Sequence, residues 1–154
     1  MSSSAPDAYL RNAVMTATPE QLQLMLYDGA IRFAKQGIEA LERKDFETSF
    51  NALSRAQKIV LELQSGLRRE VNPELCDRMA QLYQFIYSQL VDAGIHHTPS
   101  AIAESVRLLE YQRETWVMLI EKVSEERTSP VVAADASRPR EGSGTSGTVL
   151  SVEG

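Results

Sequence analysis

The chain has 154 residues, of which 43% are hydrophobic and 24% are charged, and this composition is typical of a soluble globular protein with one core. Its formal net charge is −5, so it lacks the excess of clustered Lys and Arg that nucleic acid and anionic membranes attract. The single cysteine, Cys76, excludes an intramolecular disulfide and fits a reducing compartment.

Two further features favour a cytoplasmic location. No apolar run approaches the roughly 20 residues that are needed to span a bilayer, and the first residues lack the charged start and apolar core of a signal peptide. We therefore expect a cytoplasmic protein with no nucleic acid partner and no membrane insertion.

The N-terminal segment, residues 1–17, contains one short amphipathic stretch from Asp7 to Met15. Nine residues are marginal as an isolated helix because nucleation is costly, so we expect a short cap helix that docks loosely. Thr18 is the predicted N-cap of a second helix, with Pro19 at its first position and Gln21 placed to complete a capping box. This second helix is expected to end near Arg43.

Three more helices follow in the prediction. Asp45 begins one that ends near Leu67, Asn72-Pro73 begins one that Gly94 ends as the residue after the helix, and Thr98-Pro99 begins one that ends near Glu126. Because the connections are short, consecutive helices should lie antiparallel. The expected fold is all-α: an antiparallel up-down four-helix bundle over residues 18–126, with a short N-terminal helix and a disordered C-terminal tail over residues 127–154.

The second helix is apolar over more of its circumference than a surface helix needs, about 220° against roughly 100°. One stripe is the expected core stripe: Leu24, Tyr27, Ile31, Ala34, Ile38 and Leu41. A second stripe lies beside it: Leu22, Leu26, Gly29, Phe33 and Gly37. Bundle helices often contact two neighbours, so the second stripe either packs within the bundle or faces a partner.

Glycines inside this helix need an explanation, because each costs about 0.5–1 kcal/mol relative to alanine. Gly29 either forms a surface dip between Leu26 and Phe33 that admits a partner helix, or allows close approach within the bundle. The sequence pattern leaves both interpretations open.

The remaining helices also carry apolar stripes. The expected core residues of the third and fourth helices are Phe46, Phe50, Leu53, Val60, Leu67, Leu75, Met79, Leu82, Ile86 and Leu90. The core stripe of the fifth helix, from Ile102 to Val123, leaves Tyr111 and Met118 pointing elsewhere as candidate partner contacts.

Residues for catalysis or metal binding are not grouped in this sequence. It has no Glu-x-x-His motif, and His96 and His97 are adjacent in a connection without carboxylate support. Cys76 is expected to be an inert buried thiol, and a G-x-G-x-x-G match at 142–147 lies in the tail rather than between a strand and a helix. We predict no enzyme, no cofactor and no metal, and instead a protein that binds helices.

Residues 9–19 (YLRNAVMTATP) and 24–30 (LMLYDGA) resemble the N-terminal signature of the flagellin-specific export chaperone family, FliS. Residues 56–59 (AQKI), 82–86 (LYQFI) and 113–116 (RETW) resemble its later helices, so the resemblance covers about Tyr9 to Val123 in order. Gln84 and residues 87–89 depart from the family pattern, so polar contacts of that helix are not carried over.

The resemblance implies a cytoplasmic chaperone that binds the C-terminal segment of flagellin, prevents premature polymerisation and delivers it to the flagellar export gate. Because their segment is marginal as a helix, we hypothesise that Tyr9, Val14 and Met15 cover the apolar face of the bundle when no client is bound and move aside when one arrives. The candidate partner-binding residues are Tyr9, Val14, Met15, Leu22, Leu26, Tyr27, Gly29, Phe33, Tyr111 and Met118. The alternatives are a homodimeric structural bundle and a binding module for another flagellar regulator.

Overall fold

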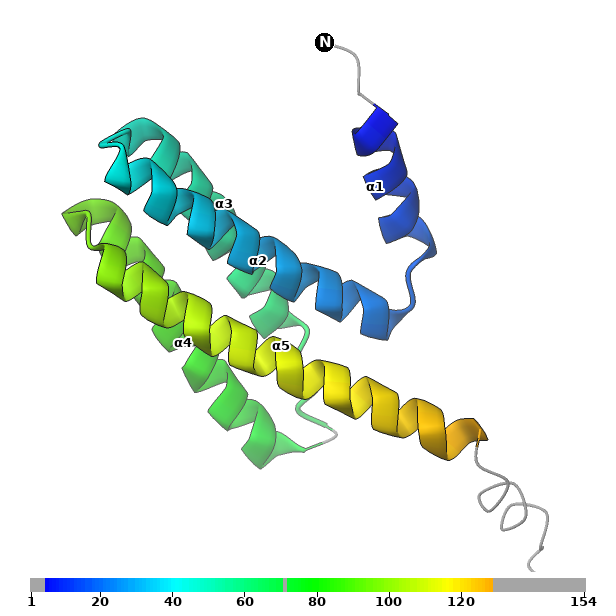
Figure 1. The fold of residues 1–154 in the computed structure, drawn as a ribbon. Coiled ribbons are helices and arrows are strands. Elements are labelled where there is room, and N and C mark those ends of the chain that lie inside the picture. The colour runs from blue at the N-terminus through cyan, green and yellow to red at the C-terminus, as the bar shows by residue number, and fades with distance from the viewer. Residues whose placement is uncertain (1–4, 71, 129–154) are drawn as a thin grey trace, which may run out of the picture. The chain divides into compact units, whose positions relative to one another are not determined.

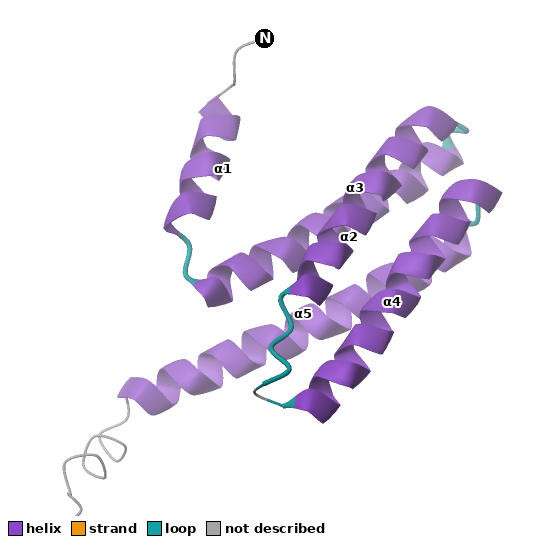
Figure 2. Cartoon of the chain, turned by 180° about the vertical axis from the view of Figure 1, so that it is seen from behind, coloured by secondary structure: helices purple, strands orange, loops and turns teal. Residues whose placement is uncertain are grey.

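The computed structural model describes residues 5–70 and 72–128, which form five α-helices and no strand. The helices are α1 (Ala5–Thr16), α2 (Pro19–Glu42), α3 (Phe46–Ser65), α4 (Pro73–His96) and α5 (Pro99–Thr128) (Figures 1 and 2). The chain divides into two compact units, Met1–Trp116 and Val117–Gly154, whose boundary falls within α5. Most of the predicted tail, residues 129–154, lies outside the described residues.

Three helix starts are fixed by side chains, as predicted. Thr18 accepts a hydrogen bond from the backbone N–H of Gln21 at 3.1 Å, and the Gln21 side chain accepts one from the Thr18 N–H at 3.0 Å. Asp45 and Asn72 cap α3 and α4 by accepting hydrogen bonds from the backbone N–H groups of Thr48 and Leu75. Each cap satisfies a backbone donor that has no partner within its helix.

The predicted end of the fourth helix at Gly94 is wrong. Helix α4 continues to His96, and His97 is the C-cap in the left-handed region with φ of 55°. Its N–H donates to the carbonyl of Ala93 at 2.8 Å. Gly94 therefore lies within α4, where it faces α3. A β-carbon at this position would lie 3.7 Å from Cδ1 of Leu53, which is an ordinary van der Waals distance.

Within the first unit, α5 runs antiparallel to α2. The indole N–H of Trp116 donates to the carbonyl of Glu20 at 3.0 Å, at the start of α2. Further along α2, Asp28 pairs with Arg113 and Lys35 pairs with Glu110, the latter at 3.1 Å. Contacts with later residues of α2 thus involve earlier residues of α5, as expected for antiparallel helices. The helices alternate in direction along the chain in Figure 1, which confirms the predicted up-down all-α bundle.

The bundle core contains two tyrosines. Tyr27 on α2 and Tyr83 on α4 are 2% and 0% exposed, and their hydroxyl oxygens lie 2.6 Å apart. The same core cluster contains aliphatic and small side chains from four helices: Ala30, Ala34, Leu53, Ala56, Val60, Leu63, Ile86, Leu90, Ile102 and Leu109. Small residues on α2 and α3 bring these two helices close together.

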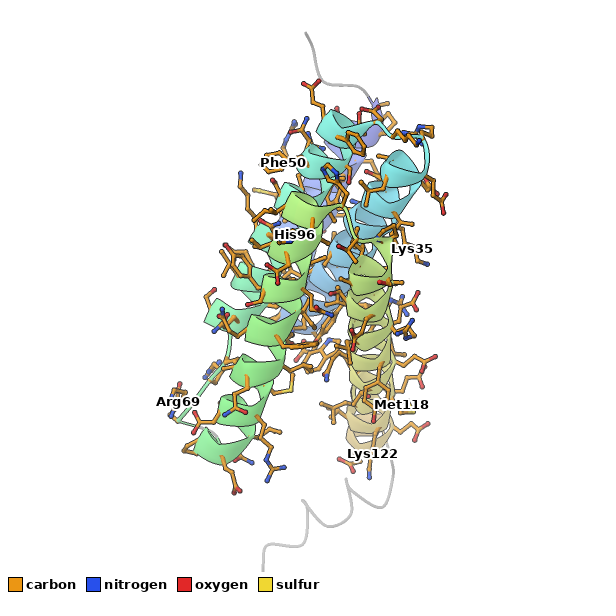
Figure 3. The ribbon with its side chains drawn as sticks, turned by 90° about the vertical axis from the view of Figure 1, so that its left-hand side faces the viewer. Lys35, Phe50, Arg69, His96, Met118 and Lys122 are labelled. Carbon is orange, nitrogen blue, oxygen red and sulfur yellow. The ribbon has the colours of Figure 1, made fainter. Side chains whose placement is uncertain are left out.

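Four predicted core residues are exposed instead. Phe46, Phe50, Leu75 and Val123 keep 46%, 59%, 50% and 36% of their surface accessible. For Phe46 and Phe50 the reason is that α3 buries its smaller residues against α2, so that the Ser49 hydroxyl donates to the Gly37 carbonyl at 3.1 Å. Phe46 stacks on the His97 ring with centroids 4.2 Å apart. Phe50 and His96 lie at one end of the bundle and Arg69 at the other (Figure 3).

Candidate partner-binding surface

The first apolar surface belongs to α1, which has no buried residue. Tyr9 and Met15 are 76% and 79% exposed, and Leu10 and Val14 are about half exposed. A groove of about 420 Å³ lies between α1 and the start of α2, with these residues along its walls: Tyr9, Asn12, Ala13, Thr16, Ala17, Gln21 and Met25. The three predicted α1 contacts are therefore accessible on a helix with little packing of its own.

The candidates on α2 divide by burial. Leu22 is 39% exposed, while Leu26 and Phe33 are half-buried and pack against the core. Tyr27 is in the core and its hydroxyl bonds to Tyr83. Its assignment as a partner contact is corrected, because its side chain is directed into the bundle.

The candidate partner contact at Gly29, as a surface dip, is also corrected. Gly29 is buried, and a β-carbon there would lie 3.1 Å from Cδ1 of Ile59 on α3. At Gly37 the β-carbon would lie 2.7 Å from Cδ2 of Leu53. Both glycines therefore allow α2 and α3 to approach closely, which is the second of the two interpretations left open by the sequence.

Two arginines lie against the Phe33 ring where α2 meets α3. The guanidinium carbon of Arg32 lies 4.9 Å from the centroid of the Phe33 ring, and that of Arg55 lies 5.4 Å from it. Arg32 precedes Phe33 on α2, whereas Arg55 comes from α3. Sequence reasoning missed this cluster, because no pattern along one helix shows which α3 side chain meets Phe33.

The candidates on α5 lie in different units. Tyr111 is 66% exposed and belongs to the first unit, and Met118 is 63% exposed and belongs to the second. Each is accessible within its own unit, as a partner contact requires.

In the part of the chain that the structure describes, no three His, Cys, Asp or Glu residues are placed to hold a metal ion. Cys76 is buried. None of the helices in residues 5–70 and 72–128 is long and apolar enough to cross a membrane.

Two polar groups at the contacts of α2 with α4 and α5 have shifted pKa values. Burial, followed by the neighbouring Tyr27, raises the pKa of the Tyr83 hydroxyl well above its ordinary value. The hydrogen bond to the Asp28 carboxylate, together with its charge, raises the pKa of Arg113. Both shifts favour the protonated forms that hold α2 against α4 and α5.

A helical bundle with accessible apolar side chains on α1, α2 and α5 has the construction of a protein that binds other chains. The family model described as "Flagellar protein FliS" matches residues 1–123. The chain belongs to the FliS family, which is a family of chaperones and not a class of enzymes, and the resemblance inferred from the sequence is confirmed.

Related proteins agree with this assignment. The chain is 35% identical over 120 residues to the flagellar secretion chaperone FliS of Bacillus subtilis (strain 168), covering 78% of this chain and 89% of the relative. It is 33% identical over 116 residues to that of Salmonella typhimurium, covering 75% and 86%. A solved bacterial flagellar chaperone has the same fold, with a TM-score of 0.64 at 20% identity over 77% of this chain and 99% of that one.

Proposed function

We propose that this protein is a cytoplasmic export chaperone that binds the C-terminal helical segment of flagellin. It prevents premature polymerisation of flagellin and delivers it to the export gate of the flagellar type III apparatus. Membership of the FliS family supports a role as a flagellar secretion chaperone. The observation that carries the client proposal is the apolar surface at the start of α2, where Leu22 is exposed and a groove of about 420 Å³ lies between α2 and α1.

This surface offers a physical basis for holding a polymerisation-prone segment. A disordered client segment loses conformational entropy when it folds into a helix, and burial of its apolar face offsets that loss. Binding then needs no covalent step. A client helix on this surface keeps its own apolar residues away from other flagellin molecules, which is how the chaperone delays assembly.

Helix α1 acts as a displaceable cover in this proposal. It buries none of its residues and is joined to α2 by the short stretch around Ala17, so little packing is lost when it moves. We expect amide hydrogen exchange of Tyr9–Met15 to become faster when the client peptide binds. Unchanged protection of this segment would contradict the cover role.

The decisive experiment is calorimetric titration with a synthetic flagellin C-terminal peptide. The test variant is Leu22→Glu, and the matched control is Ile95→Glu, because Leu22 and Ile95 are exposed aliphatic residues (39% and 63%) near opposite ends of the bundle. We expect Leu22→Glu to weaken binding about tenfold, which corresponds to about 1.4 kcal/mol, and Ile95→Glu to bind as wild type. Circular dichroism melts establish that both variants are folded.

Sedimentation with and without the peptide tests the homodimer alternative. We expect the proposed chaperone to form a complex with the peptide whose mass exceeds that of the free chain. A stable homodimer that ignores the peptide would contradict the proposed function.

A further inference from the structure

Two arginines from different helices surround one half-buried aromatic ring. Arg32 on α2 and Arg55 on α3 place their guanidinium carbons 4.9 Å and 5.4 Å from the Phe33 ring centroid. The ring attracts both cations through its quadrupole and holds their long side chains near the line where α2 meets α3. Positive charge is therefore concentrated at one place on a chain whose net charge is −5.

Neither guanidinium has an acidic partner in the part of the chain that the structure describes. Ion pairs within 4.0 Å there involve other arginines and lysines, namely Lys35, Arg68, Arg69, Arg78 and Arg113. Arg32 and Arg55 are both exposed. A guanidinium has five N–H donors in a planar fork that matches a carboxylate, so these two groups are free to bind acids from another molecule.

Apolar surface lies one helical turn from Arg55, since Ile59 follows it by four positions on α3. Ile59, which packs over Gly29, is half-buried, and it lines a shallow pocket of about 330 Å³ with Lys58, Leu61 and Glu62. Lys58 adds a third exposed cation, and Glu62 is the acidic residue of the pocket. The combination of Phe33, Ile59 and Leu61 with basic groups suits a helix that has apolar and acidic residues side by side.

We propose that the α2–α3 surface recognises the client through carboxylates, with Arg32 and Arg55 each binding an Asp or Glu side chain on one face of the client helix. Phe33 and Ile59 contact the apolar residues next to those acids. Both guanidinium carbons lie within 5.4 Å of one ring centroid, so the proposal expects the two client acids to lie three or four positions apart on one face of a helix, where Cβ atoms are about 5–6 Å apart. This inference rests on the proposed function and names the chemistry by which the client is selected.

The test is calorimetric titration of the flagellin C-terminal peptide and of a second peptide with its Asp and Glu residues changed to Asn and Gln. The test variant is Arg32→Gln/Arg55→Gln. The matched control is Arg78→Gln/Arg107→Gln, which makes the same change in net charge at exposed positions on α4 and α5. Circular dichroism melts verify the folding of each variant.

We expect Arg32→Gln/Arg55→Gln to bind the acidic peptide about five- to tenfold more weakly, as two partly exposed ion pairs allow, and the control to bind as wild type. Wild type should bind the amide peptide more weakly, and the arginine variant should not distinguish the two peptides. The affinity of wild type should also fall with added salt more steeply than that of the variant.

Failure of this inference differs from failure of the proposed function. If the wild-type chain binds the acidic peptide and the arginine variant binds it equally well at low salt, carboxylate recognition by Arg32 and Arg55 is overturned while the chaperone function stands. Equal affinity of wild type for the acidic and amide peptides overturns it too. If wild type binds neither peptide, the proposed function falls and this inference falls with it.

Discussion

At the scale of single residues, the tyrosine pair joins α2 to α4 through the only polar contact between two large core side chains in the described residues. Each hydroxyl is removed from water, and each depends on the other for its hydrogen bond. Burial also raises the pKa of Tyr83, so the neutral form that donates or accepts this bond is kept in the folded state. The two hydroxyls together therefore contribute more to the free energy of unfolding than either would without its partner.

A double-mutant cycle tests this coupling. Tyr27→Phe or Tyr83→Phe should each lower the free energy of unfolding by about 1–3 kcal/mol, because the remaining hydroxyl is buried without a partner. The double variant should lose less than the sum of the two single losses, since no orphaned hydroxyl remains. Urea denaturation measures all four chains, and strictly additive losses would contradict the coupling.

The two interhelical glycines predict opposite effects of substitution by alanine. Gly37→Ala places a methyl group 2.7 Å from a methyl of Leu53, which is fully buried and has no room to move. We expect a loss of about 1–2 kcal/mol after the gain in helix propensity is included. Gly29→Ala meets only the end of the half-buried Ile59 side chain at 3.1 Å, so it should be neutral or stabilising by up to about 0.5 kcal/mol. Thermal denaturation decides, and a Gly29→Ala variant that is less stable than Gly37→Ala would contradict this packing.

At the scale of elements, helix starts are local devices that act through one or two side chains. The Asp45 carboxylate accepts a hydrogen bond from the Thr48 hydroxyl at 2.7 Å and one from its backbone N–H at 3.2 Å. These bonds favour the ionised form and lower the pKa of Asp45. Since the folded pKa lies below the unfolded one, the cap stabilises the folded state at neutral pH and loses that effect as pH falls through the folded pKa.

Asp45→Asn tests the charge of this cap. Asparagine keeps an oxygen that caps the helix but cannot ionise. We expect wild type to be more stable than Asp45→Asn near neutral pH, and the difference in melting temperature to disappear as the pH falls from neutral to below the lowered pKa of Asp45. A difference that does not change between these pH values would show that the charge is not involved.

At the scale of the whole molecule, the first unit is closed by contacts between its second and fifth helices. Trp116 donates to the Glu20 carbonyl across 96 positions of the sequence, and Asp28 pairs with Arg113 across 85. Trp116 is the single tryptophan of the chain. Its fluorescence therefore reports the contact that closes the bundle.

Denaturant unfolding followed by two signals tests the cooperativity of this unit. Because Trp116 contacts the bundle core, we expect its fluorescence and the far-ultraviolet circular dichroism to change with the same midpoint, as in two-state unfolding. Trp116→Phe, which lacks the indole donor, should lower the circular dichroism midpoint by an amount equivalent to about 1 kcal/mol. A fluorescence transition at lower denaturant than the circular dichroism transition would show instead that α5 detaches separately.

The sequence alone determined the features that depend on neighbouring residues. Caps at Thr18, Asp45 and Asn72 involve side chains three positions from their partners, so the starts of α2, α3 and α4 and the antiparallel order were predictable. The family was predictable too, because its motifs are collinear stretches of sequence.

Tertiary packing decided the features that depend on which helices meet. The wheel of α2 showed two apolar stripes but not their neighbours, and only the position of α3 over Gly29 and Gly37 showed that both glycines serve the α2–α3 contact. Phe46 and Phe50 looked like core residues because they are large and apolar, yet α3 buries Ser49 and Ala52 instead. The pairing of Arg32 and Arg55 around Phe33 has the same origin, since contacts between helices are set by packing geometry that hydrophobic periodicity along one helix does not contain.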